Sequence, residues 1–146
     1  MNSQHIRELR AFNRFYTNII GLLDGHFLNS KYSLPEVRVM FELNQNPDLT
    51  ASDIIAMIDI DKGYLSRILR KLEKERLLVK MTSAADSRAL ALRLSAKGKK
   101  EFDVLNRASD KQIEHFLKAL SDRECDELLQ MMSRIKKLLT NVSKNG

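Results

Sequence analysis

The hydrophobic pattern of this 146-residue chain changes its period once, and that change restricts the folds it can adopt. Along most of the chain apolar residues recur at spacings of three and four, which predicts amphipathic helices. Between Leu77 and Leu94 they alternate with other residues instead, as in two strands separated by a loop over Thr82–Arg88. The expected fold class is therefore mainly α with one small β-hairpin.

Two short amphipathic segments come directly before this hairpin. Thr50-Ala-Ser-Asp53 has the spacing of a capping box, and Asp61 is a good N-cap for a helix over Lys62–Arg76. Two helices joined by a tight turn and followed by a hairpin predict a winged helix-turn-helix. In the second helix a buried stripe is expected at Leu65, Ile68, Leu69 and Leu72, with a polar, mostly basic face opposite.

The net charge of +6 is concentrated in one block of the chain. Residues 61–100 contain twelve Lys or Arg against four Asp or Glu, whereas the remainder has thirteen basic and fifteen acidic residues. A basic run is often only a solvated face, but Arg67 and Arg70 have no acidic residue four positions away. The polarised charge favours a polyanionic partner, and we expect double-stranded DNA.

Arginine is the residue type best suited to reading base edges, because its fork matches O6 and N7 of guanine. At the tip of the hairpin, Arg88 is expected in the minor groove, with Asp86 orienting the loop; an ordinary exposed ion pair is the simpler alternative. The predicted contacts comprise Ser66, Arg67 and Arg70 at bases, Thr50, Ser52, Lys62, Lys71 and Lys74 at phosphates, and Tyr64 and Arg88.

Longer helices are predicted on both sides of the helix-turn-helix. One spans about residues 6–28, and serine caps at Ser33, Ser95 and Ser121 begin three others. We expect one domain over residues 1–146, with a DNA-binding core at about 33–98 and dimerisation helices at about 1–30 and 99–142. The terminal apolar stripes are wider than a monomer of this size needs, and the residues assigned to a homodimer interface are Ile6, Leu9, Phe12, Tyr16, Leu128, Met132, Ile135 and Leu139.

Catalytic, cofactor and metal-binding patterns are absent from the sequence, so an enzyme is not expected. The three histidines lie in separate segments, and the known glycine-rich phosphate loops are missing. Cys125 lies among three carboxylates that oppose thiolate formation, so a redox role is the less favoured interpretation. Apolar runs fall far short of the roughly 20 residues that span a bilayer, and a cytoplasmic protein without a membrane partner is expected.

The wing carries the most specific signature. The stretch Asp86-Ser-Arg88-Ala-Leu-Ala-Leu-Arg-Leu94-Ser-Ala-Lys-Gly98, with the order of the helices, resembles the multiple-antibiotic-resistance regulator (MarR) family over essentially the whole chain. The resemblance implies an obligate homodimer with interleaved terminal helices on a pseudo-palindromic operator. We expect a repressor, although the sequence itself does not distinguish repression from activation. In many members a small aromatic or phenolic effector releases the DNA. More narrowly, FNRFYTNIIGLL and DKGYLSRILRKLEKE are similar to the regulator half of proteins fused to an acetyltransferase.

Two departures from the family pattern stand out. Arg76 replaces the usual glycine after the recognition helix, and because a left-handed C-cap costs a non-glycine residue roughly 1 kcal/mol, a different helix end is expected. The sensing cysteine of the peroxide-responsive branch is missing from the N-terminal region. The alternatives to a DNA-binding regulator are a regulatory segment of an acetyltransferase and a helical adaptor whose basic face meets an acidic protein.

Overall fold

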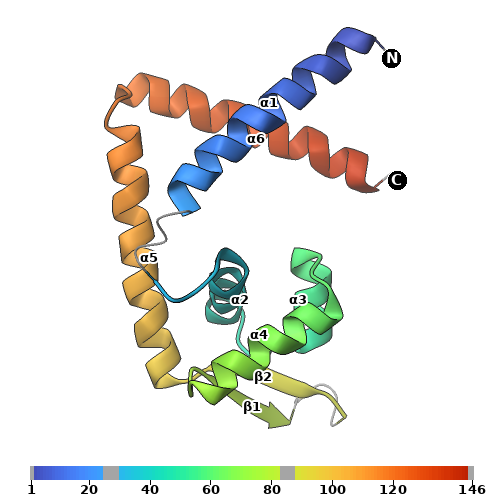
Figure 1. The fold of residues 1–146 in the computed structure, drawn as a ribbon, viewed down its shortest axis with the longest axis vertical. Coiled ribbons are helices and arrows are strands. Elements are labelled where there is room, and N and C mark those ends of the chain that lie inside the picture. The colour runs from blue at the N-terminus through green and yellow to red at the C-terminus, as the bar shows by residue number, and fades with distance from the viewer. Residues whose placement is uncertain (1, 25–29, 83–87, 145–146) are drawn as a thin grey trace. The chain divides into compact units, whose positions relative to one another are not determined.

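The structure, a computed structural model, describes residues 2–24, 30–82 and 88–144. Most of these residues are helical, and the two strands pair as an antiparallel hairpin, which confirms the predicted fold class. The elements in chain order are α1 (Ser3–Asp24), α2 (Leu34–Gln45), α3 (Ala51–Ile58), α4 (Lys62–Lys74), β1 (Leu78–Thr82), β2 (Leu90–Leu94), α5 (Ala96–Leu117) and α6 (Asp122–Lys144) (Figure 1).

The chain divides into two compact units, Met1–Ser109 and Asp110–Gly146, with the boundary inside α5. The first unit contains the helix-turn-helix and the hairpin, and the second contains the end of α5 and all of α6. The single domain over residues 1–146 stays a prediction. Within the described ranges, no helix is both long and apolar enough to cross a membrane.

The helix starts were predictable because they depend on local capping. At the start of α3 the Asp53 N–H donates to the Thr50 hydroxyl at 3.2 Å, and the Thr50 N–H donates to the Asp53 carboxylate at 2.9 Å. The Asp61 carboxylate accepts from the Tyr64 N–H at 2.9 Å and begins α4. These contacts satisfy amide groups that the first helical turn leaves without partners. Predicted caps are also present at Ser33, Ser95 and Ser121.

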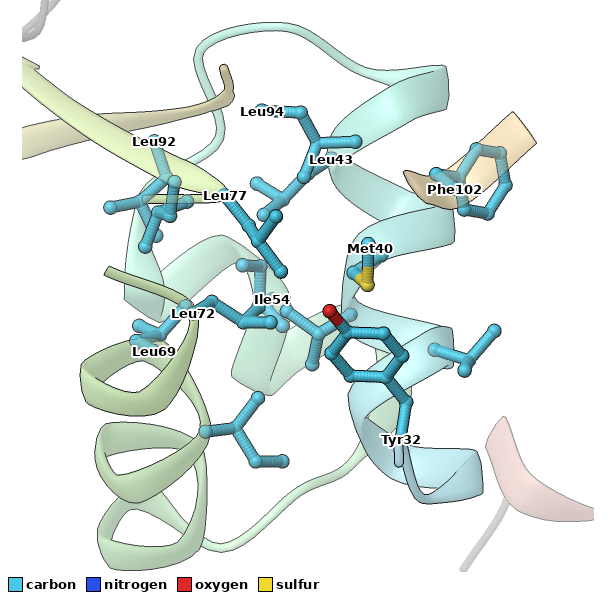
Figure 2. Close-up of a cluster of buried hydrophobic side chains, with 14 of the residues drawn as sticks. Tyr32, Met40, Leu43, Ile54, Leu69, Leu72, Leu77, Leu92, Leu94 and Phe102 are labelled. Carbon is cyan, nitrogen blue, oxygen red and sulfur yellow. The ribbon is translucent and has the colours of Figure 1, made fainter. Parts of the chain in front are cut away.

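A single apolar core joins the helix-turn-helix to the hairpin (Figure 2). The stripe predicted for α4 is buried as expected, and α3 contributes Ile54. From α2, Met40 packs into the same cluster, and Phe102 reaches it from the first half of α5. The side chains with less than 2% of their surface exposed are Val39, Met40, Ile54, Leu65, Leu72, Leu77 and Leu92.

The hairpin turns one leucine-rich face to this core. Leu78 pairs with Leu94 and Lys80 with Leu92, and Leu92 also donates its N–H to the Leu49 carbonyl at 2.8 Å. The first strand begins at Leu78 rather than Leu77. Leu90 does not anchor the wing as Leu92 and Leu94 do, because it pairs with Thr82 at the loop end of the ladder and is 53% exposed.

The end of α4 corrects two expectations. The helix stops at Lys74 instead of Arg76. Arg76 adopts the left-handed conformation, with φ 62°, although a non-glycine residue was expected to avoid it. The Arg76 N–H donates to the Glu73 carbonyl and the Leu77 N–H to the Leu72 carbonyl, both at 2.9 Å, which is a Schellman motif. Hydrogen bonds, each worth roughly 1 kcal/mol, therefore offset the strain of a non-glycine residue at this position.

The first helix begins at Ser3, three residues before the position that the sequence pattern suggests, and is described as far as Asp24. Its predicted end at about residue 28 falls on residues 25–29, which lie outside the described part of the chain. In α5, the helix ends at Leu117 although the apolar pattern continues to Leu120. Apolar spacing predicts which residues share a face, but it does not specify where the last turn stops.

Candidate nucleic-acid interface

The outer face of α4 is exposed and basic. Its buried stripe leaves Lys62, Ser66, Arg67, Arg70 and Lys74 on the solvent side of the helix. None of these four cations forms an ion pair with a residue that the structure describes. Unpaired cations on one helix face leave their charge available to an anionic partner, as the sequence pattern indicated.

Arg67 is held in place by its neighbour. Its guanidinium carbon lies 5.6 Å from the centroid of the Tyr64 ring, and Tyr64 itself is 37% exposed. Such a cation–π contact is worth roughly 0.5–1 kcal/mol at an exposed site. This contact favours one placement of the Arg67 side chain, which remains exposed.

A groove of about 500 Å³ lies between the start of α3, the side of α4 and the hairpin. Five residues of the predicted DNA-contacting set line it: Thr50, Ser52, Ser66, Arg70 and Arg88. They come from three elements, so the tertiary structure brings them around one concave surface. Lys62, Tyr64, Arg67 and Lys74 lie on α4 outside this lining.

The groove also contains an acidic residue that the sequence interpretation left out. Glu73 lines the groove together with Lys80 of β1, and their charged groups are 2.9 Å apart. Lys80 therefore neutralises the carboxylate, which would otherwise repel phosphates. This ion pair joins α4 to the hairpin. Its two residues are seven positions apart, and the sequence pattern did not predict that they meet.

The start of α3 presents hydrogen-bond donors to the groove. Thr50 is half-buried and Ser52 is exposed in the first turn of the helix. Hydrogen bonds from the Thr50 N–H and hydroxyl hold the pKa of Asp53 below its ordinary value, so this carboxylate stays ionised at the cap. Backbone N–H groups at a helix N-terminus suit phosphate oxygens.

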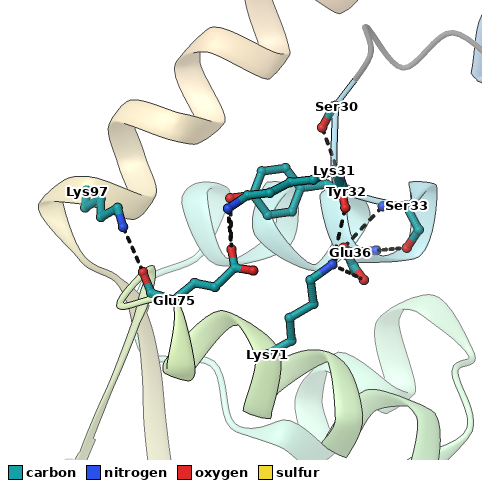
Figure 3. A network of polar contacts seen from close by, with 8 residues as sticks. All are labelled: Ser30, Lys31, Tyr32, Ser33, Glu36, Lys71, Glu75 and Lys97. Atoms are coloured by element: carbon teal, nitrogen blue, oxygen red, sulfur yellow. Dashed lines mark hydrogen bonds and ion pairs between the residues drawn. The ribbon is translucent and has the colours of Figure 1, made fainter.

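Lys71 departs from the predicted set. Its ammonium lies 2.8 Å and 3.0 Å from the two carboxylate oxygens of Glu36, and it donates to the Lys31 carbonyl at 3.3 Å (Figure 3). The side chain is directed at the start of α2 and does not line the groove. The charge of Lys71 is therefore compensated within the protein, and its predicted contact with DNA stays a prediction.

Arg93 belongs to the basic block but was not predicted to have a role. Its guanidinium forms two hydrogen bonds to the Asp48 carboxylate, at 2.5 Å and 2.8 Å, from β2 to the connection between α2 and α3. These bonds hold the pKa of Asp48 below its ordinary value and raise that of Arg93. Sequence periodicity carries no information about a pair separated by 45 positions.

At the wing, Arg88 is exposed just before β2, at the loop end of the hairpin, and lines the groove. Asp86, predicted to orient the loop, lies outside the described residues. The proposed roles of both residues therefore stay predictions.

A second, smaller cavity of about 270 Å³ lies in the first unit, between the segment before α2 and the first half of α5. Its lining includes Lys31, Tyr32, Glu101, Val104 and Ala108. Burial and the nearby carboxylates of Glu101 and Glu75 raise the pKa of Tyr32, so its phenol keeps its proton at neutral pH. Among the described residues, no three His, Cys, Asp or Glu come together as metal ligands would.

Comparisons with known proteins agree with this architecture. Residues 31–89 match the sequence model of the MarR family, from the segment before α2 to the start of the wing's second strand. The HTH-type transcriptional regulator BilQ of Clostridioides difficile is 28% identical over 102 residues, which cover 70% of this chain and 69% of that protein.

Solved structures show the same fold at lower sequence identity. Wild-type MarR from E. coli superposes with a TM-score of 0.74 at 15% identity, covering 86% of this chain and 94% of that one. FabT from Streptococcus pneumoniae, solved in complex with DNA, superposes with a TM-score of 0.76 at 19% identity. The match covers 97% of this chain and 99% of that one. Over residues 31–89 the chain is thus similar to the MarR family of DNA-binding transcription regulators, and it has the winged helix-turn-helix fold of solved MarR-family structures.

Proposed function

We propose that this protein is a homodimeric repressor that binds a pseudo-palindromic operator sequence-specifically, acts in the cytoplasm and catalyses no reaction. The observation that carries the proposal is the groove of about 500 Å³, which Ser66, Arg70 and Arg88 line from α4 and the hairpin. The exposed basic face of a recognition helix suits the major groove, which admits an α-helix, and an arginine on the adjacent hairpin suits the minor groove.

In the bound complex, Arg67 and Arg70 read base edges while Thr50 and Ser52 contact the phosphates beside α3. Base contacts supply the specificity, and phosphate contacts set the orientation of the protein on the duplex. Lys62 and Lys74 contribute phosphate contacts at the two ends of α4. A dimer seated in this way blocks access to the operator, and repression follows from occupancy.

Exposed apolar faces support the homodimer. On α1, Leu9 is 55% exposed, and on α6 Leu139 is 55% exposed. Leu128 is half-buried. The other residues assigned to the interface are also exposed, namely Ile6, Phe12, Tyr16, Met132 and Ile135. Exposed apolar stripes of this kind mark interaction sites, and a second copy of the same chain supplies matching stripes on its own α1 and α6.

The test combines selection of bound sequences from random DNA with light scattering of the free protein. Two inverted half-sites centred about 10 base pairs apart and twice the mass of one chain are expected. A protein that enriches no sequence contradicts DNA reading, and binding to an acidic protein under the same conditions favours the adaptor alternative. A one-chain mass at micromolar concentration contradicts the dimer.

Control by a small aromatic or phenolic ligand completes the proposal. The cavity beside Tyr32 supports it, since about 270 Å³ lies near the lower end of ligand-pocket volumes and fits a single ring. Millimolar salicylate, used as the probe, is expected to release the DNA from the wild type but not from Ala108→Trp, which fills the cavity. Equal release from both proteins contradicts this site.

A further inference from the structure

Two contacts one helical turn apart connect the recognition helix to the segment Lys31–Glu36. The first is the Lys71–Glu36 ion pair, whose side chains are 36% and 13% exposed. Glu36 serves two purposes there, because the same carboxylate accepts from the Ser33 N–H in the capping box of α2. The ammonium of Lys71 is thus directed at a carboxylate that the start of α2 already holds in place.

The second contact lies at the C-cap of α4. The Tyr32 hydroxyl donates to the Glu75 carboxylate at 3.2 Å, and Lys31 approaches the same oxygen at 3.1 Å (Figure 3). Burial alone would raise the pKa of Glu75. The hydrogen bonds from Lys31 and Tyr32, together with the positive charges of Lys31 and Lys71, outweigh burial and keep that pKa below its ordinary value. Lys97 of α5 also donates to the Glu75 carbonyl at 3.1 Å.

These two contacts act on α4 differently from its apolar stripe. Hydrophobic packing of the leucines is strong but non-directional, whereas a hydrogen bond weakens steeply when distance or angle changes. Lys71 and Glu75 are four residues apart and meet the same segment, so together they oppose rotation and sliding of the helix. Arg67 and Arg70 need such control, since a two-pronged contact to guanine tolerates little displacement.

We propose that Lys71 and Glu36 form a positioning pair that sets the recognition helix for sequence-specific binding, and that Lys71 does not contact DNA itself. This inference rests on the proposed function, namely that α4 reads base edges. The pair belongs to one compact unit, within which the Tyr32–Glu75 contact provides a second point of attachment. Loss of the pair lets α4 shift and lowers affinity only where base contacts matter.

Glu36→Gln separates the two roles that Lys71 could have. Glutamine preserves the capping box of α2, so the substitution removes the charge with little effect on the helix start. As a positioning partner, Glu36 is needed for specific binding, and affinity for the preferred operator is expected to fall roughly 3- to 10-fold. If Lys71 instead contacted phosphate, removing its acidic partner would tighten binding to every DNA sequence.

Lys71→Met is the second variant, and Lys74→Met is its matched control on the same helix. For Lys71→Met we expect a similar loss on the operator, unchanged non-specific affinity and an unchanged dependence of binding on salt. Lys74→Met should weaken binding to all sequences and reduce the slope of log affinity against log salt by about 0.9. The double variant Glu36→Gln, Lys71→Met should lose little more than Lys71→Met alone.

The following results decide between the interpretations. A reduced salt slope in Lys71→Met, or tighter binding in Glu36→Gln, overturns the proposal in favour of a phosphate contact. An unchanged ratio of specific to non-specific affinity, with a lower thermal midpoint, shows that the pair only stabilises the fold and also overturns it. A wild type without sequence preference contradicts the proposed function, whereas a preference that both variants retain contradicts this inference alone.

Discussion

Gly98 lies so close to the main chain of Leu77 that a Cβ on Gly98 would be 2.1 Å from the Leu77 carbonyl oxygen. This contact places the first turn of α5 directly against the end of the recognition helix. Ser95, three residues earlier, reinforces it, because its hydroxyl donates to the Arg76 carbonyl at 2.6 Å and accepts from the Gly98 N–H at 3.0 Å. The serine and glycine that follow the wing therefore have a structural explanation.

Gly98→Ala is expected to destabilise the protein, although glycine to alanine normally stabilises a helix interior by about 1 kcal/mol. The added methyl group meets backbone that must move, and overpacking of this kind costs roughly 1–3 kcal/mol. Urea denaturation measures the difference. The matched control is Gly63→Ala in α4, where the Cβ would lie 3.2 Å from the Asp61 side chain, so its effect should stay within about 1 kcal/mol. Equal stability of Gly98→Ala and the wild type would contradict this explanation.

Arg70→Ala is expected to weaken binding to the preferred operator by roughly 1–3 kcal/mol and to relax specificity at one position in each half-site. The reason is the loss of a two-pronged contact to one base pair. Binding to operators with single substitutions, compared at fixed salt, measures it. Lys74→Ala is the comparison and should weaken binding uniformly. If Arg70→Ala shows the same uniform loss, Arg70 contacts phosphate instead.

Arg88→Ala is expected to weaken binding most on operators with A·T-rich flanks and to leave the fold and the mass in solution intact. Narrow A·T-rich minor grooves concentrate negative potential and attract an inserted arginine. Operators with identical cores and different flanks, compared at one salt concentration, provide the measurement. Equal losses on all flanks would assign Arg88 to phosphate, and no loss would remove the wing from the interface.

Stability should fall in acid partly through Asp53. Its pKa is lower in the folded protein than in the unfolded chain, where it is near 3.8, because the folded carboxylate accepts hydrogen bonds from Thr50. The contribution to stability is therefore complete above the unfolded pKa and disappears as the pH falls through the folded pKa. Denaturation midpoints of the wild type and Asp53→Asn should differ at neutral pH and converge below about pH 4. A constant difference across this range would show that the cap does not depend on the charge of Asp53.

The helices, their caps and the hairpin were predictable because each depends on neighbouring residues. A capping box such as Thr50–Asp53 closes within four positions, and the buried stripe of α4 repeats every three or four. The exposed basic face of α4 follows from the same periodicity. The element order and the predicted DNA-contacting residues on α4 therefore came from local patterns alone.

Only the tertiary structure decided which charges remain available and how the helix ends. Lys71 and Arg70 are adjacent basic residues in the sequence, but Lys71 meets Glu36, 35 positions away, whereas Arg70 lines the groove. Arg93 is paired with Asp48 across 45 positions, and Arg76 accepts a left-handed conformation beside Ser95. Local propensity reports the cost of such a conformation, but its compensation comes from groups that meet only when the core packs. Long-range pairing depends on three-dimensional position. A sequence pattern therefore indicates which residues make up the basic face, but it does not indicate which of those cations are already paired within the protein.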